Sequence, residues 1–416
     1  MQTSLMDLIK DTAEGREADR ILRSCVHCGF CLATCPTYQL LGDELDSPRG
    51  RIYLMKQMME GHEVTARTQL HLDRCLTCRN CETTCPSGVE YGKLLDIGRH
   101  MVEERVPRSA GERWLRRILR FFLPRRYLFT PSLRLGQVFR PLLPGALRAK
   151  VPPRQHAGVW PVATHQRQVL ILDGCVQSGF TPNTNAAAAR VLDRLGITVR
   201  REPAEQCCGA LSFHLNAQDE AKAYMRANID AWWPHVEAGV EAIVSSASGC
   251  GVMVKDYGHV LADDPVYAEK ARRISALTRD LGEYLAAQDY AGLRVDGEQR
   301  VAFHPPCTLQ HGQKLHGVVE GVLRQVGFQL TPVPDAHLCC GSAGTYSITQ
   351  PELSQRLLAQ KLDALQSGRP GVIATANIGC QLHLLSKAGV AVVHWIELLD
   401  RHAVAVGTPA RERQAA

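Results

Sequence analysis

Residues 25–36 read CVHCGFCLATCP, and residues 75–86 repeat the same spacing as CLTCRNCETTCP. Each stretch has the form C-x2-C-x2-C-x3-C-P, so two matched groups hold half of the chain's 16 cysteines. Three thiolates on one tight turn can bind three corners of a metal–sulfur cube, but a fourth on that turn cannot reach the far corner. The proline after each group ends the loop and turns the chain. Two cysteine-rich loops that complete each other's metal sites are therefore expected.

This spacing resembles that of bacterial ferredoxins, in which the fourth cysteine of each motif binds the other motif's [4Fe–4S] cluster. The resemblance implies two clusters with crossed ligand sets. The first set is Cys25, Cys28, Cys31 and Cys85. The second set is Cys35, Cys75, Cys78 and Cys81. Zinc is the weaker interpretation, because structural zinc sites commonly use paired C-x2-C units.

The segment between the two motifs predicts a helical domain. RGRIYLMKQMMEG places Ile52, Met55 and Met59 on one helical face, and Gly61 is a typical helix stop. LDIGRHMVEERV, after the second motif, also has a helical pattern. We therefore expect residues 1–104 to form a helical ferredoxin-like domain. Its SPRGR stretch at 47–51 puts two arginines, Arg49 and Arg51, near the first cluster.

The basic charge is concentrated in one stretch. Residues 101–154 contain thirteen Lys or Arg and three Glu, a local charge of +10 in a chain whose net charge is +6. Within the connector 105–165, residues 112–123 predict an amphipathic basic helix. Two interpretations remain: the helix docks on an anionic membrane or a partner protein, or it packs its apolar face on the protein with its arginines in water. Nucleic acid is not an expected partner, because no groove-reading motif accompanies the charge.

The chain after residue 166 consists of two copies of one unit. QVLILDGC at 168–175 and RVAFHPPC at 300–307 are both apolar strands that end in a cysteine, and helices and further strands follow in the same order. This alternation predicts an α/β fold, α+β overall, with largely parallel sheets in domains 166–290 and 298–404. Four cysteines of each copy should meet at the sheet edge where ligands bind. They are Cys175, Cys207, Cys208 and Cys250, and then Cys307, Cys339, Cys340 and Cys380.

The order cysteine, CCG, cysteine resembles the cysteine-rich (CCG) domain of heterodisulfide reductase subunits. The resemblance implies that these domains can hold additional iron–sulfur clusters. That family's motif ends in C-x2-C, whereas this chain has Ala247 and Asn377 where the first of those cysteines would stand. Metal ligands and redox-active or reduced thiols both remain open for these eight cysteines. A vicinal disulfide is the least favoured state, because it strains the peptide bond between the two residues.

The whole arrangement, two cubane motifs, a basic connector and two CCG domains, resembles the iron–sulfur subunits of bacterial glycolate oxidase. CVHCGFCLATCPTYQLLGDELDSPRGRIYL, LTCRNCETTCPSGV, NIDAWWP and CCGSAGTY carry this resemblance. It implies a complex with two FAD-linked subunits that oxidise glycolate to glyoxylate, from which this chain relays electrons toward membrane quinone. Related glycerol-3-phosphate or lactate dehydrogenases share the architecture and are the alternative.

Two other functions fit the sequence less well. The CCG edges could themselves reduce a disulfide or a quinone, with His214 and His304 as proton donors, or the chain could be a zinc-bound interaction scaffold. No G-x-G-x-x-G motif opens a helix, so we expect no flavin or nicotinamide site and no catalytic residue in this chain. The N-terminus has no secretory pattern, and no apolar run is long enough to span a bilayer. A cytoplasmic protein, peripheral on the inner face of the inner membrane, is expected.

Overall fold

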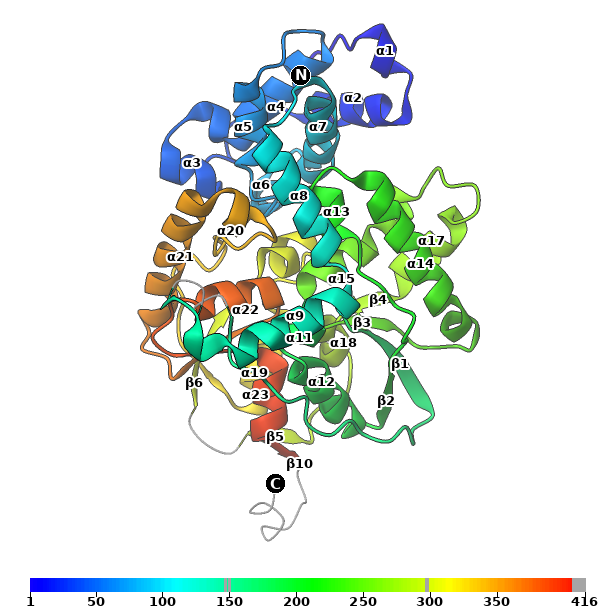
Figure 1. Cartoon of the computed structure of the whole chain (residues 1–416), viewed down its shortest axis with the longest axis vertical. Coiled ribbons are helices and arrows are strands. Elements are labelled where there is room, and N and C mark those ends of the chain that lie inside the picture. Colours follow the sequence, from blue (N-terminus) through cyan, green and yellow to red (C-terminus); the bar gives the residue numbers. More distant parts are fainter. Residues whose placement is uncertain (146–147, 149–150, 296–298, 406–416) are drawn as a thin grey trace.

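The computed structural model describes residues 1–145, 148, 151–295 and 299–405. Its N-terminal part is a helical domain that lies above the two α/β domains in Figure 1. The elements of this helical domain are α1 (Asp7–Lys10), α2 (Ala13–Ser24), α3 (Pro36–Leu41), η1 (Glu44–Asp46), α4 (Pro48–Met59), α5 (Ala66–Asp73), α6 (Asn80–Thr84) and α7 (Tyr91–Arg105).

Helix α4 forms where the apolar pattern predicted it. Ser47 caps its first turn by accepting from the Gly50 N–H, and Pro48 takes a position whose missing N–H costs no helical bond. Ile52, Met55 and Met59 are buried as expected, and Gly61 has a positive φ just beyond the helix end. Helix α7 packs so closely on α4 that a Cβ at Gly98 would overlap the Met55 side chain.

The connector contains α8 (Ala110–Phe122), α9 (Arg126–Val138) and the short turn η2 (Arg140–Leu142). A capping box between Ser109 and Glu112 starts α8, which runs down from the helical domain in Figure 1. Helix α9 buries Phe129 and Leu133 against α11 (Gln177–Phe180) of the first α/β domain. The connector thus spans both halves of the molecule.

The first α/β domain has a fully parallel sheet in the order β2-β1-β3-β4. Its strands are β1 (Arg167–Leu172), β2 (Ile197–Arg200), β3 (Ile243–Ser245) and β4 (Thr278–Asp280). Its helices after α11 are α12 (Asn183–Asp193), α13 (Ala210–His214), α14 (Gln218–Glu237), α15 (Ser248–Lys255), α16 (Tyr257–Val260), α17 (Ala268–Leu277) and α18 (Leu281–Ala286).

The second α/β domain repeats this topology as β7-β6-β8-β9, again fully parallel. Its strands are β6 (Arg300–His304), β7 (Gln329–Leu330), β8 (Val372–Thr375) and β9 (Ala391–His394). Its helical elements are η3 (Thr308–Gly312), α19 (Val318–Val326), α20 (Tyr346–Thr349), α21 (Pro351–Gln366), α22 (Ile378–Leu385) and α23 (Trp395–His402). A separate antiparallel pair joins β5 (Leu293–Val295) to β10 (Ala403–Ala405).

The two sheets share one apolar core. Val169 and Ile171 of β1 belong to the same buried cluster as Val301 and Phe303 of β6. Helix α12 packs on α23, and α18 packs on α19, so each copy closes the other's open face. The fourth strand of each sheet, β4 and β9, follows the last cysteine of its copy and was not predicted from the sequence.

The apolar face of α8 is exposed, which differs from the interpretation that it packs on the protein. Trp114, Ile118 and Phe121 have exposed fractions of 63%, 54% and 55%. Two of its arginines turn to the protein instead: Arg116 lies 3.6 Å from Asp73, and Arg120 lies 3.4 Å from Glu220. Within the described residues, no helix is both long enough and apolar enough to span a membrane.

Candidate metal centres

One pocket of about 430 Å³ lies beneath the first cysteine motif. Among the residues that line it are all four cysteines of the first predicted ligand set, Cys25, Cys28, Cys31 and Cys85. Cys81 also borders this pocket. Cys28 is exposed, and the neighbouring Val26 and Phe30 are 67% and 61% exposed, so the first pocket lies at the molecular surface.

A second pocket, of about 300 Å³, lies beside the first. It is lined by all four cysteines of the second predicted set, Cys35, Cys75, Cys78 and Cys81. The fold therefore brings Cys85 to the first motif's pocket and Cys35 to the second motif's pocket. The chain's 16 cysteines are all free thiols, so each pocket presents the four thiols that a [4Fe–4S] cluster requires.

The two motif loops have the same backbone conformation. His27 and Thr77, each two residues after a first cysteine, have φ values of 57° and 53°. Gly29 and Arg79, each four residues after it, have φ values of 88° and 59°. Left-handed residues are uncommon outside glycine, and their clustering marks a loop that is shaped for function. In the second loop this shape points the Thr77 N–H at Cys75 Sγ, at 3.4 Å.

Burial favours the neutral thiol form for several cysteines of these pockets. Burial raises the pKa of Cys31 to about 11, and it raises the pKa of Cys78 and Cys81 well above the usual value. A metal ion deprotonates coordinating thiols, so the donor sets fit iron bound through thiolates.

The two arginines of the SPRGR stretch serve different pockets, which corrects the expectation that both lie near the first cluster. Arg49 lines the first pocket and pairs with Glu44 at 2.8 Å. Arg51 is fully buried and lines the second pocket instead. Helix α4 turns successive side chains by about 100°, so residues two apart in the chain face different directions.

A buried carboxylate holds Arg51 in place. Asp46 lies 3.3 Å from Arg51, 3.1 Å from the His71 ring and 2.8 Å from Arg74. Asp43, Asp46 and His71 lie close enough together to hold a metal ion, but the Asp46 carboxylate is already taken by two guanidinium groups. This cluster is therefore an ion-pair network that places a positive charge beside the second pocket.

The four cysteines of each α/β domain form a row of thiols. In the first domain, Cys175 Sγ lies 3.5 Å from Cys207 Sγ, and the contacts continue through Cys208 to Cys250. In the second domain, Cys307 contacts Cys339, Cys339 contacts Cys340, and Cys340 contacts Cys380. Each predicted set of four thus converges on one edge of its sheet.

Asn377, which stands where the related domain has a fifth cysteine, points into the second row. Its amide donates to Cys380 Sγ at 3.6 Å and accepts from the Gly249 N–H at 3.2 Å. Ala247 is buried at the matching place in the first domain. Of the two predicted proton donors, His304 is fully buried behind the second row, while His214 is exposed and lies 3.7 Å from Asp96.

The second motif loop packs directly on the second α/β domain, a contact that the sequence did not indicate. Cys78 belongs to the same apolar cluster as Cys307 and Cys339. Asn80 donates to the His337 carbonyl at 3.3 Å, and the Tyr346 hydroxyl donates to the Arg74 carbonyl at 3.1 Å. These contacts join segments more than 250 residues apart, so no local pattern could have revealed them.

Comparison with known families matches three segments of the chain. Residues 21–89 match a 4Fe-4S dicluster domain, and residues 169–255 and 301–385 each match a cysteine-rich domain. A solved structure, titled as that of a hypothetical protein from Helicobacter pylori, superposes with a TM-score of 0.50 over 97% of this chain and 74% of that chain. At 9% identity this likeness shows the fold alone.

Curated relatives extend the match to the whole chain. The glycolate oxidase iron-sulfur subunit of Escherichia coli strain K12 is 58% identical over 96% of this chain and 99% of its own length. The probable glycolate oxidase iron-sulfur subunit of Bacillus subtilis strain 168 is 30% identical over 95% of this chain and 97% of its own length. Lactate utilization protein A of Bacillus licheniformis is 28% identical over 56% of this chain and 99% of its own length. The chain therefore belongs to the family of glycolate oxidase iron–sulfur subunits.

Proposed function

We propose that this chain is the electron-transfer subunit of a flavin-dependent glycolate dehydrogenase, which oxidises glycolate to glyoxylate. The observation that carries the proposal is the pair of adjacent four-thiol pockets, one at the surface and one against the second α/β domain. Two [4Fe–4S] clusters, bound by the crossed cysteine sets, would supply one-electron carriers that split the two-electron output of a reduced flavin.

Residues of this chain would set the reduction potentials of the two clusters. Arg51 brings a buried positive charge to the second pocket, and the Tyr91 hydroxyl donates to Cys75 Sγ at 3.6 Å. Positive charge and hydrogen bonds to sulfur both favour the reduced, more negative state of an iron–sulfur centre. The first pocket has a single guanidinium, from Arg49, that is partly exposed and shared with Glu44. We infer that the second site has the higher potential of the two.

The substrate side of the reaction belongs to the partner subunits in this proposal. Two FAD-linked oxidase-type subunits would bind glycolate and reduce their flavin, and quinone would accept the electrons at the end of the relay. The surface around Cys28, with exposed Val26 and Phe30, offers an apolar contact for a partner that exchanges electrons with the first site.

We further propose that α8 holds the complex at the cytoplasmic face of the inner membrane. Its outward face is apolar at Trp114, Leu115, Ile118 and Phe121. Exposed Arg113 and Arg117 lie on the same helix, within the stretch that carries a charge of +10. Apolar side chains beside arginines are what an anionic lipid surface binds.

The electron-transfer proposal is tested by Cys78→Ser in the assembled complex. Serine cannot replace the thiolate, so we expect flavin reduction by glycolate to proceed as in the wild type while reduction of a quinone analogue falls to background. Rapid-mixing absorbance follows the flavin step, and steady-state assays follow the quinone step. Cys28→Ser should have the same effect at the first site.

Thr34→Ser is the matched control for these variants. It lies in the first motif loop, and serine keeps the hydroxyl that donates to the Cys31 carbonyl. This variant should retain both steps. Full quinone-linked turnover in the Cys78→Ser complex would contradict the proposed relay.

A further inference from the structure

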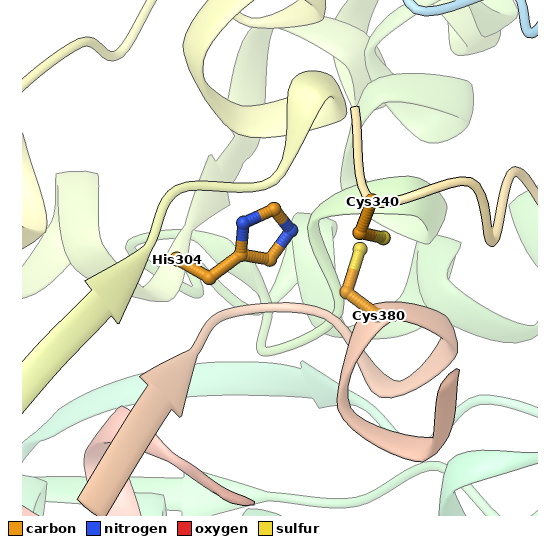
Figure 2. Close-up of side chains that lie close together, drawn as sticks. All are labelled: His304, Cys340 and Cys380. Atoms are coloured by element: carbon orange, nitrogen blue, oxygen red, sulfur yellow. The ribbon is translucent and has the colours of Figure 1, made fainter. Parts of the chain in front are cut away.

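His304 lies at the carboxyl end of β6, behind the thiol row of the second α/β domain. Figure 2 shows its ring pointing toward Cys340 on a loop and Cys380 in the first turn of α22. All three side chains are buried, and His304 is 0% exposed. Their ligand atoms, one from each residue, all lie within 4.8 Å of one another.

Neither ring nitrogen of His304 has a hydrogen-bond partner among the described residues. Buried polar groups in folded proteins are almost always hydrogen-bonded, so an unpartnered imidazole calls for an explanation. His394 ends β9, which β8 separates from β6 in the same sheet, and it is equally buried but hydrogen-bonded. Its Nε2 lies 2.8 Å from the Ser246 carbonyl oxygen, and its Nδ1 accepts from the Ile396 N–H at 3.2 Å. The fold can therefore satisfy a buried histidine at this level of the sheet, but it leaves His304 unpaired.

The three ligand atoms have the spacing and chemistry of a site for one metal ion. Zinc binds thiolate sulfur at about 2.3 Å and imidazole nitrogen at about 2.0 Å, which places tetrahedral ligands roughly 3.5–3.8 Å apart. Small side-chain movements bring atoms that lie within 4.8 Å to that spacing. One imidazole and two thiolates suit Zn²⁺ or Fe²⁺ and do not suit Mg²⁺ or Ca²⁺.

We propose that His304, Cys340 and Cys380 bind a single thiophilic divalent ion, Zn²⁺ or Fe²⁺, inside the second α/β domain. Binding releases the two thiol protons to solvent. The remaining tetrahedral position is open to Cys339, which contacts Cys340, or to a ligand from outside. Asn377 orients Cys380 through its amide and fixes that amide through Gly249 of the first domain.

The two copies of the repeat differ at the position of His304. Leu172 of the first domain corresponds to His304 of the second domain. Each stands three residues before the first cysteine of its row. Leu172 is buried and cannot bind a metal. The mixed nitrogen–sulfur site is therefore specific to the second copy, and it does not depend on the clusters proposed for the helical domain.

The test counts zinc, iron and acid-labile sulfide in the full-length chain, purified without oxygen and supplied with Zn²⁺ under reducing conditions. We expect about one ion per chain beyond the iron that sulfide accounts for. Elemental analysis identifies the bound ion. Zinc is measured directly, and mononuclear Fe²⁺ is detected as iron in excess of acid-labile sulfide. His304→Gln should lose this ion and keep the sulfide-linked iron.

His394→Gln is the matched control, because it removes an equally buried histidine whose nitrogens are already paired. It should keep the ion. If His304→Gln does not fold, Cys380→Ser takes its place in the metal count. X-ray absorption spectroscopy of the ion in the wild-type chain is a second measurement, and it should show one nitrogen and at least two sulfur ligands. A wild-type chain that binds no such ion, or a folded His304→Gln chain that keeps it, would overturn the proposal.

Discussion

The glycine that follows each adjacent cysteine pair sets how closely the loop approaches the next helix. Gly341 has a φ of +86°, and a Cβ there would lie 2.6 Å from the Ser354 carbonyl oxygen and 2.9 Å from Leu357 Cβ. Gly209 has a similar φ of +89°, but its nearest neighbour would be the Ala221 carbonyl oxygen at 3.1 Å. In the second domain, the CCG turn therefore approaches the backbone of α21 so closely that only glycine fits at position 341.

We predict that Gly341→Ala loosens α21 more than Gly209→Ala loosens α14. The left-handed backbone alone costs an alanine about 1–3 kcal/mol, and only at Gly341 does the methyl group also overlap a helix carbonyl. Hydrogen–deuterium exchange of Pro351–Gln366 and of Gln218–Glu237 measures this local opening. Equal exchange of α21 in wild type and Gly341→Ala would refute the close-contact explanation.

Residue-scale prediction from sequence reached furthest at the two cysteine motifs, whose spacing resembles that of bacterial ferredoxins. The two motifs predicted crossed ligand sets, and each pocket is lined by the four cysteines assigned to it, although ligation itself stays a prediction. The ligand role now proposed for His304 could not have been predicted, because only the folded sheet shows that its ring lacks a partner and lies beside Cys380. Its one signal in the sequence was the contrast with Leu172 in the first copy.

At the scale of elements, α8 shows what periodicity can and cannot predict. The pattern of residues 112–123 correctly predicted an amphipathic helix. It could not predict which face turns outward, because that depends on Asp73 and Glu220, which lie far away in the sequence and bind Arg116 and Arg120. The short strand β4 (Thr278–Asp280) was missed for a related reason: three residues with a central arginine contain no apolar run.

We predict that Trp114→Ala weakens binding of the purified protein to vesicles of phosphatidylethanolamine and phosphatidylglycerol by about tenfold or more, the factor expected for losing one large apolar contact. Co-sedimentation measures the partition. Val266→Ala is the control, since Val266 is also exposed but lies outside the connector. Binding that is insensitive to Trp114 or to the anionic lipid would instead favour the helix as a protein-docking surface.

For the whole molecule, the repeat and its parallel sheets could be predicted, because equivalent cysteines follow equivalent apolar strands in the two copies. The assembly of the parts was not. The second motif loop lies on the second α/β domain through Cys78, Asn80 and Arg74, whose partners are more than 200 residues away. The fold places the second four-thiol pocket next to the thiol row that contains Cys307 and Cys339, so these two candidate metal centres adjoin each other.

We propose that the N-terminal loops hold two [4Fe–4S] clusters with crossed ligands. Counting iron and acid-labile sulfide in the anaerobically purified full-length chain, with electron paramagnetic resonance after reduction, tests it most directly. We expect about eight sulfide-linked irons per chain and the spectrum of two neighbouring clusters. About four irons, or zinc without sulfide, would contradict it.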